Sequence, residues 1–168
     1  MKNELTNIGR KSKKAFFSKV SLKKKNKVLN DYCKLIKKNK RLIIYQNKKD
    51  VHNAKEKGLE INLINRLILD DNKILNIINS IKSIIKLKDP TNIILEKWKR
   101  PNGLNIKRVS IPIGVIGVIY ESRPNVTSDV ASLCFKSGNV VILKGGSEAI
   151  NSNKALAKLF RKALKKNK

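Results

Sequence analysis

The sequence predicts an α/β protein, with helices first and a parallel sheet near the end. Three observations lead to this class. Apolar residues recur at helical spacing through residues 1–90, and a segment with a period of two follows at 91–111. Two β-branched runs, GVIGVIY (114–120) and NVVILK (139–144), then alternate with helical patterns. We expect an N-terminal helical segment (1–90), a β-hairpin (91–111) and an incomplete parallel α/β unit (112–168).

The first two helices are predicted from apolar residues on one face. The first helix carries Leu5, Ile8, Ala15 and Phe16. Ser21 is the expected N-cap of the second helix, because a serine oxygen accepts a hydrogen bond from an exposed backbone N–H. The apolar face of the second helix is formed by Leu22, Leu29, Tyr32, Cys33 and Ile36.

Two more helices complete the first segment. The third ends near Gly58, since glycine readily takes the left-handed conformation that stops a helix. The fourth starts at Asp70 or Asp71 and is closed by the Asp89-Pro90 step. Its buried face is a stripe of isoleucines: Ile74, Ile77, Ile78, Ile81, Ile84 and Ile85.

The next segment predicts a β-hairpin. NIILEKWKR (92–100) and LNIKRVSIP (104–112) flank a PNG turn, in which Asn102 and Gly103 tolerate positive φ. A hairpin between two larger units projects as an arm or covers the edge of a sheet. The alternative is a hairpin that closes a small core of its own.

The last segment reads as strand, loop, helix, strand, loop, helix. Its first run has no charged residue, so we expect that strand to be buried on both faces. Thr127, Ser128 and Asp129 are N-cap candidates for the helix that Gly138 ends, and Ser147 is the expected cap of the last helix. The apolar face of that helix contains Leu156, Leu159, Phe160, Ala163 and Leu164.

This organisation predicts where a ligand binds. In open parallel sheets ligands bind beyond the carboxyl ends of the strands, which here means residues 121–125 and 144–148. Neither loop carries a standard nucleotide motif. Gly145 and Gly146 allow close approach of a ligand, the following helix N-terminus favours an anion, and Lys144 adds a positive charge. The alternative for Lys144 is a solvated residue at a strand end.

Charge is the strongest compositional feature. Lys and Arg total 39 against 12 Asp and Glu, a formal charge of +27. This points to a polyanion such as nucleic acid, or to compositional drift towards lysine. Aromatics are only 5%, and nearly all the charge is lysine, whereas nucleic-acid sites use arginine and interleaved aromatics. We therefore expect neither a nucleic-acid partner nor a functional role for most lysines.

Cysteine and histidine usage excludes some chemistry. Cys33 and Cys134 match no disulfide framework or metal spacing, and His52 is the single histidine, so we expect no metal site. Both cysteines are expected to be buried and inert. The sequence starts without a secretory signal and no run is long enough to span a bilayer, so we expect a soluble protein in a reducing cytoplasm.

One long run carries a family resemblance. RVSIPIGVIGVIYESRPNVTSDVASLCFKSGNVVILKGGSEA (108–149) resembles the γ-glutamyl phosphate reductase family, within the aldehyde dehydrogenase superfamily. YESRPNVTSD followed by KSGNVVILKGG is the most specific part. KDVHNAKEKGL (49–59) and the Asp89-Pro90 step also match in position. The resemblance implies an aldehyde dehydrogenase-like fold, in which 112–168 begins a Rossmann-like NADP-binding domain.

The resemblance also implies an activity. Such enzymes use NADPH to reduce L-glutamyl 5-phosphate to L-glutamate 5-semialdehyde and phosphate, in proline biosynthesis. A cysteine thiolate displaces phosphate, and hydride then releases the aldehyde. The full-length family members are expected to form homo-oligomers, with the hairpin as an oligomerisation arm, and to couple with glutamate 5-kinase.

The resemblance assigns roles to two residues of the first loop. Asn125 is the candidate donor to the acyl oxyanion, and the alternative is a turn that caps the next helix. Arg123 is placed to bind the acyl phosphate or the substrate carboxylate. The alternative for Arg123 is a structural ion pair with Glu121 or Asp129.

The second loop is the implied cofactor site, formed by Lys144, Gly145, Gly146, Ser147 and Glu148. Lys144 matches a superfamily lysine that reaches the adenosine ribose. Relatives that use only NAD often have glutamate at the position of Ser147, so a neutral serine favours NADPH. The negative charge of Glu148, next to Ser147, acts against a 2′-phosphate and so complicates this argument.

The family's nucleophilic cysteine and pyrophosphate-binding loop match no part of this sequence, and Cys134 matches a non-catalytic cysteine. We therefore expect the N-terminal portion of a reductase, truncated and inactive alone, with the catalytic domain absent. The alternative is a non-catalytic remnant or a polyanion-binding module. An open sheet edge and uncovered helix faces argue against the alternative.

Overall fold

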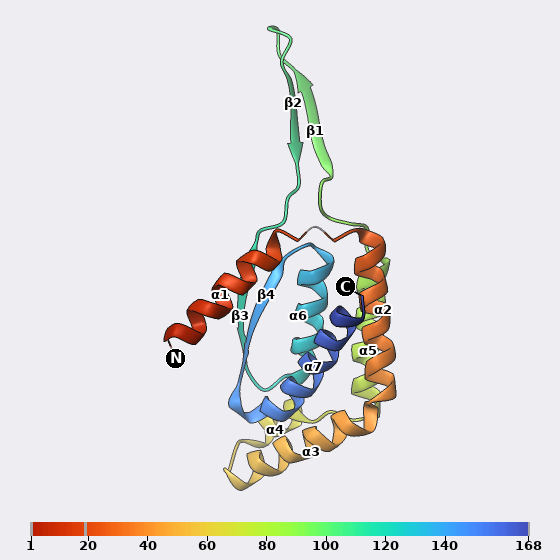
Figure 1. Cartoon of the computed structure of the whole chain (residues 1–168). Coiled ribbons are helices and arrows are strands. Elements are labelled where there is room, and N and C mark those ends of the chain that lie inside the picture. The colour runs from red at the N-terminus through yellow and green to blue at the C-terminus, as the bar shows by residue number, and fades with distance from the viewer. Residues whose placement is uncertain (1, 19, 168) are drawn as a thin grey trace.

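The computed structural model describes residues 2–18 and 20–167. Most of its helices pack around one hydrophobic core, beside a small parallel sheet, and a β-hairpin projects from the body (Figure 1). The helices are α1 (Lys2–Phe16), α2 (Leu22–Lys38), α3 (Lys40–Glu56), α4 (Ile61–Leu67), α5 (Asp71–Lys86), α6 (Pro124–Lys136) and α7 (Ile150–Lys166), with a 3₁₀ turn, η1 (Ser147–Ala149), before the last. The strands are β1 (Ile94–Lys99), β2 (Asn105–Val109), β3 (Val115–Tyr120) and β4 (Val140–Gly145).

The hydrophobic core lies where α2, α5 and α7 pack together, with α3 across one end. The predicted isoleucine stripe of α5 is confirmed, because Ile74, Ile77 and Ile81 are almost completely buried. The predicted face of α2 is also buried, apart from Leu22 at its start. The apolar face of α7 packs into the same cluster through Leu156, Leu159, Phe160, Ala163 and Leu164.

Several predicted helix ends are confirmed. The Ser21 hydroxyl accepts a hydrogen bond from the backbone N–H of Lys24 at 3.3 Å, and Asp70 Oδ1 accepts one from the N–H of Lys73 at 2.7 Å. Gly58 follows α3 with φ of +66°. Helix α4 was not predicted, because its seven residues are too few for a helical period to stand out.

The hairpin forms the predicted arm. β1 and β2 pair antiparallel and project from the body, and their side chains are exposed except at Ile106, which is half-buried (Figure 1). The alternative of a hairpin with its own core is therefore wrong. At the turn only Gly103 has positive φ, at +87°. Asn102 instead accepts a hydrogen bond from the Leu104 N–H through its side-chain oxygen at 3.2 Å.

The predicted parallel pair is confirmed, but its predicted burial is wrong. β3 and β4 run parallel, with Val115 opposite Val140 and Tyr120 opposite Gly145. Along β3 the side chains alternate between exposed and half-buried, and Ile119 is 84% exposed. β4 is mostly half-buried. Among the described residues the parallel sheet has two strands, so its outer edges are open and the helices cover only part of its faces.

The starts of the last two helices differ from the prediction. α6 begins at Pro124, so Thr127, Ser128 and Asp129 lie within the helix and do not cap it. The Ser128 hydroxyl instead bonds to the Tyr32 hydroxyl at 2.7 Å. Ser147 makes no capping hydrogen bond, because a 3₁₀ turn separates it from α7. Gly138 ends α6 as predicted, with φ of +74°.

Candidate functional site

The two predicted loops meet at one edge of the parallel pair. β3 ends at Tyr120 and β4 ends opposite it at Gly145. Beyond this point the N–H of Gly146 donates to the Tyr120 carbonyl at 2.9 Å, and the Ser122 hydroxyl donates to Glu148 Oε1 at 3.0 Å. The strand ends therefore hold both loops side by side, as the parallel topology requires.

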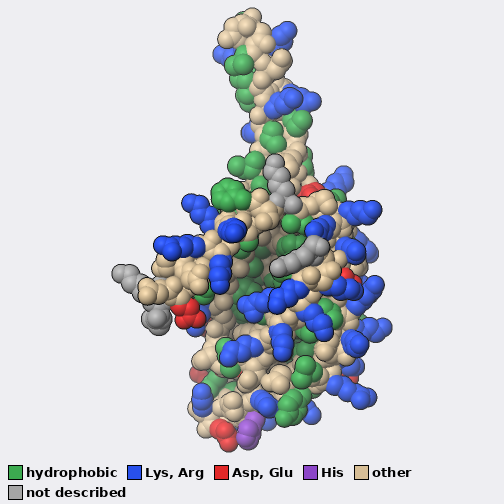
Figure 2. All heavy atoms as spheres, viewed as in Figure 1, with side chains coloured by type: hydrophobic (Ala, Val, Ile, Leu, Met, Phe, Trp, Pro, Cys, Tyr) green, Lys and Arg blue, Asp and Glu red, His purple; other side chains and the backbone are tan. Residues whose placement is uncertain are grey.

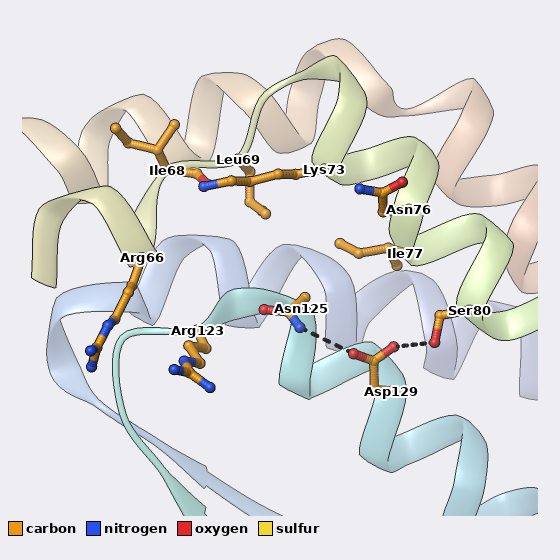
Figure 3. A pocket seen from close by; sticks show the side chains of 10 residues that line it. All are labelled: Arg66, Ile68, Leu69, Lys73, Asn76, Ile77, Ser80, Arg123, Asn125 and Asp129. Atoms are coloured by element: carbon orange, nitrogen blue, oxygen red, sulfur yellow. Dashed lines mark hydrogen bonds between the residues drawn. The ribbon is translucent and has the colours of Figure 1, made fainter. Parts of the chain in front are cut away.

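A polar pocket of about 420 Å³ opens beside the first loop (Figure 3). It lies between that loop, the start of α6, and the α4 to α5 region from the other half of the chain. Its lining comprises Arg66, Ile68, Leu69, Lys73, Asn76, Ile77, Ser80, Arg123, Asn125 and Asp129.

Both predicted substrate residues line this pocket. Asn125 lies in the first turn of α6, and its Nδ2 donates to Asp129 Oδ2 at 3.1 Å. It does not form the capping turn that was the alternative for it. Arg123 is the residue before α6, and its side chain forms no ion pair with any described residue. The structural ion pair with Glu121 or Asp129 is therefore wrong, and the Arg123 guanidinium is free to bind an anion.

Four polar residues of the pocket were missed from the sequence. Arg66 is on α4, and Lys73, Asn76 and Ser80 are on α5. Lys73 Nζ donates to the carbonyls of Asn65 and Ile68 at 3.0 and 2.8 Å. Arginine was the one sequence feature that could have pointed to this site. It is scarce in this lysine-rich sequence, but two arginines line the pocket.

The pocket is electropositive. Arg66, Lys73 and Arg123 contribute three positive charges, whereas Asp129 contributes one negative charge. Asp129 accepts hydrogen bonds from the Ser80 hydroxyl at 2.9 Å and from Asn125 (Figure 3). An anionic ligand suits such a site, because guanidinium groups bind carboxylates and phosphates through paired hydrogen bonds.

The second loop packs closely at Gly145. A Cβ on Gly145 would overlap the side-chain amide of the buried residue Asn153, whereas a Cβ on Gly146 would meet only the flexible end of the Glu148 side chain, which can move away. Lys144 and Ser147 are exposed beside them. The Asn153 Nδ2 atom is buried without a hydrogen-bond partner in the described chain. The loop therefore packs closely against the start of α7 at Gly145.

The N-terminus of α7 is already occupied by a carboxylate. Asp50, on α3, accepts hydrogen bonds from the backbone N–H groups of Asn151 and Ser152, at 3.1 and 2.7 Å, and from both side chains. The expectation that this helix N-terminus attracts a ligand anion is therefore wrong.

Neither cysteine belongs to the polar pocket. Cys33 and Cys134 are 7% and 8% exposed, and burial raises the pKa of both thiols above the ordinary value. Buried protonated thiols are poor nucleophiles. Within residues 2–18 and 20–167, no three His, Cys, Asp or Glu side chains gather as a metal site, and no helix is long and apolar enough to cross a membrane.

Positive side chains are spread over the face of the molecule seen in Figure 2. Figure 2 shows Lys and Arg scattered over the visible face of the body and along the hairpin. They do not gather into one stripe on that face. The partner that this charge suits, if any, stays a prediction from composition.

Comparison with known proteins identifies the fold. A Bacillus subtilis protein classed with the aldehyde dehydrogenases matches 96% of this chain and 33% of its own, with a TM-score of 0.69 at 18% identity. The chain therefore has the fold of one part of an aldehyde dehydrogenase. No protein-family model matches it.

The sequence is specifically similar to γ-glutamyl phosphate reductase. The Clostridium tetani enzyme of that name is 48% identical over 158 residues, which cover 93% of this chain and 37% of the relative. The crystal structure of the Thermotoga maritima enzyme matches with a TM-score of 0.92 at 40% identity, covering 97% of this chain and 40% of that one. The resemblance predicted from residues 108–149 is confirmed, and the chain spans about two fifths of these relatives.

Proposed function

We propose that this chain supplies substrate-binding and cofactor-binding residues of a reductase that converts L-glutamyl 5-phosphate to L-glutamate 5-semialdehyde and phosphate, in proline biosynthesis. The observation that carries the proposal is the electropositive pocket beside the carboxyl end of β3, next to a glycine-rich loop at the end of β4. The similarity to γ-glutamyl phosphate reductases supplies the substrate class.

Arg123 and Asn125 are the proposed substrate residues. The unpaired guanidinium of Arg123 binds the acyl phosphate or a carboxylate. One amide hydrogen of Asn125 is bound by Asp129, and the second is available for the acyl oxygen. A donor held in place before the reaction stabilises the oxyanion that forms when the acyl carbon is attacked.

The proposed cofactor is NADPH, which supplies hydride when bound. Lys144 contacts the adenosine ribose, and Gly145 and Gly146 present backbone that carries no side chain of its own to the nucleotide. Ser147 leaves room for a 2′-phosphate without a negative charge. Glu148 is held by the Ser122 hydroxyl, so its carboxylate is directed towards the first loop.

The nucleophile must come from polypeptide beyond these 168 residues. Displacing phosphate from the acyl group to form a thioester requires a thiolate, and both cysteines of this chain are buried and protonated. We therefore expect no turnover by the isolated chain. In a full-length reductase we expect a cytoplasmic homo-oligomer that uses the exposed hairpin as its arm and accepts its labile acyl phosphate from glutamate 5-kinase.

A chimera tests this function. These 168 residues replace the matching part of the Clostridium tetani reductase, and the reverse reaction is followed as NADP⁺ reduction with semialdehyde and phosphate. We expect an active chimera. Arg123→Gln should raise KM by about tenfold or more, and Asn125→Ala should lower kcat by about a hundredfold. Arg161→Gln, on the exposed face of α7, is the charge-matched control. A folded but inactive chimera, or turnover by the isolated chain, would contradict the proposal.

A further inference from the structure

We propose that the polar pocket recognises the head group of an α-amino acid. The Asp129 carboxylate binds the α-ammonium, and Arg66 joins Arg123 in binding the anionic groups of the same ligand. This inference rests on the proposed function and deepens it, because it names the residues that select a glutamyl substrate over a plain acyl phosphate.

Asp129 is held in a fixed orientation with acceptor capacity to spare. Ser80 Oγ donates to its Oδ1 atom and Asn125 Nδ2 donates to its Oδ2 atom, at 2.9 and 3.1 Å. Two ionised carboxylate oxygens have about four acceptor positions, so about two remain after these bonds. No lysine or arginine among the described residues pairs with Asp129. A lone carboxylate in a pocket is therefore available to a cation that arrives with the ligand.

Arg66 and Arg123 provide the opposite charge. They come from α4 and from the loop before α6, and Figure 3 shows both at the end of the pocket away from Ser80. Neither forms an ion pair with a described carboxylate. Two guanidinium groups at the same end of a pocket can both donate hydrogen bonds to an anionic ligand.

The two charged ends suit a zwitterion that carries an additional anion. A glutamyl phosphate has an α-ammonium, an α-carboxylate and a phosphate on a short flexible chain, and the pocket of about 420 Å³ accommodates a ligand of that size. Binding of the ammonium also balances the negative charge beside Asn125. The second amide hydrogen of Asn125 then faces an acyl oxygen without an uncompensated carboxylate behind it.

The ammonium contact has a chemical consequence. A neutral α-amine attacks its own 5-acyl phosphate, because the attack closes a five-membered ring: a nitrogen–carbon bond forms, phosphate leaves and the nitrogen loses a proton. An adjacent carboxylate favours the protonated amine, which has no lone pair for this attack. Asp129 therefore protects the substrate as well as selecting it.

Ligand binding to the 168-residue chain tests the inference without needing turnover. Amide resonances are followed by two-dimensional ¹⁵N NMR at constant ionic strength, with L-glutamate, N-acetyl-L-glutamate, glutarate and inorganic phosphate as ligands. We expect L-glutamate to shift resonances around Arg123 and Asp129. Glutarate and the N-acetyl compound lack the ammonium and should bind at least about tenfold more weakly.

Variants separate the two ends of the site. Asp129→Asn should abolish the preference for L-glutamate over glutarate, while Arg66→Gln should weaken both ligands by about tenfold. Arg161→Gln removes the same charge from an exposed position of α7 and should change neither. If Asp129→Asn fails to fold, the comparison of L-glutamate with its N-acetyl derivative in the unmodified chain still decides the role of the ammonium.

The inference is overturned if L-glutamate and glutarate bind equally, if Arg66→Gln binds like the unmodified chain, or if no ligand binds. Its failure is distinct from failure of the proposed function. If the chain binds L-glutamate and glutarate equally well while the chimera is active, only the inference is overturned. A chain that selects L-glutamate while the folded chimera is inactive contradicts the reductase function and leaves the amino-acid site.

Discussion

Asp50 and Ser152 lie 102 positions apart in sequence and share two hydrogen bonds, from the Ser152 backbone N–H at 2.7 Å and from its hydroxyl at 2.6 Å. With the bonds from Asn151, the Asp50 side chain caps α7 from another helix. This cap holds the start of α7, directly after the loop at 144–148.

Replacing the cap is expected to destabilise the chain. Asp50→Ala leaves buried N–H groups at the start of α7 without acceptors and should lower the free energy of unfolding by about 3 kcal/mol. Urea denaturation followed by circular dichroism measures this value. Glu56→Ala removes an exposed carboxylate from the same helix and should cost less than about 0.5 kcal/mol. Equal losses from the two variants would show that the cap contributes nothing.

Gly138 is expected to tolerate alanine poorly. Its φ is +74°, and an added Cβ would lie 3.1 Å from Pro112 Cγ, so Gly138→Ala should cost about 2 kcal/mol. Gly58 has a similar φ of +66° with open space around it, so Gly58→Ala should cost about 1 kcal/mol. Thermal denaturation of both variants measures the two costs. The Gly58 value gives the cost of backbone strain, and the excess at Gly138 gives the cost of the contact with Pro112. A Gly138 cost no greater than that of Gly58 would exclude the Pro112 contact as a cause.

Asp31 is expected to make stability depend on acid pH. The hydrogen bond from Asn167 Nδ2 at 2.9 Å lowers the pKa of Asp31 below its ordinary 3.8; burial opposes this, and Lys166 at 3.1 Å adds to it. Because the folded pKa is depressed, the contribution is complete above pH 3.8 and is lost as the pH falls through the folded value. Below about pH 4 the Tm of the unmodified chain should therefore fall more steeply than that of Asp31→Asn, whereas above about pH 5 the two curves should run parallel. Curves that stay parallel below about pH 4 would contradict this assignment.

Both thiols are expected to resist modification in the folded chain. Burial raises the pKa of Cys33 and Cys134, so neither presents a thiolate near neutral pH. Ellman's reagent should react with both only after unfolding in guanidinium chloride. Rapid labelling of one thiol in the native chain would identify an accessible thiolate and would reopen the question of a nucleophile within these residues.

Local patterns predicted the elements whose signals lie within a few residues. The α5 stripe repeats every turn, and the Ser21 and Asp70 caps act on an N–H three residues away. The hairpin turn and Gly138 depend on backbone conformations that only certain residues tolerate. In each case the interaction that forms the element is encoded beside it.

Longer-range packing decided what those patterns missed. Thr127 and Ser128 look like helix caps, but in the fold they face Tyr120 and Tyr32, so α6 starts earlier, at Pro124. The β3 run has the composition of a strand buried on both faces, but this chain provides only one neighbouring strand. The composition of a strand indicates how buried it can be, but the elements packed around it decide how buried it is.

The sequence by itself determined the order of the longer elements, the parallel pair, the candidate loops and the similarity to γ-glutamyl phosphate reductase, because each is encoded in contiguous residues. Only the tertiary structure decided what surrounds Arg123 and Asn125. Ser80 and Asp129 are 49 positions apart, and Arg66 lies on a helix too short to predict, yet packing brings all of them into one pocket. Contacts of this kind depend on how helices and strands pack in space, and no local pattern records that packing.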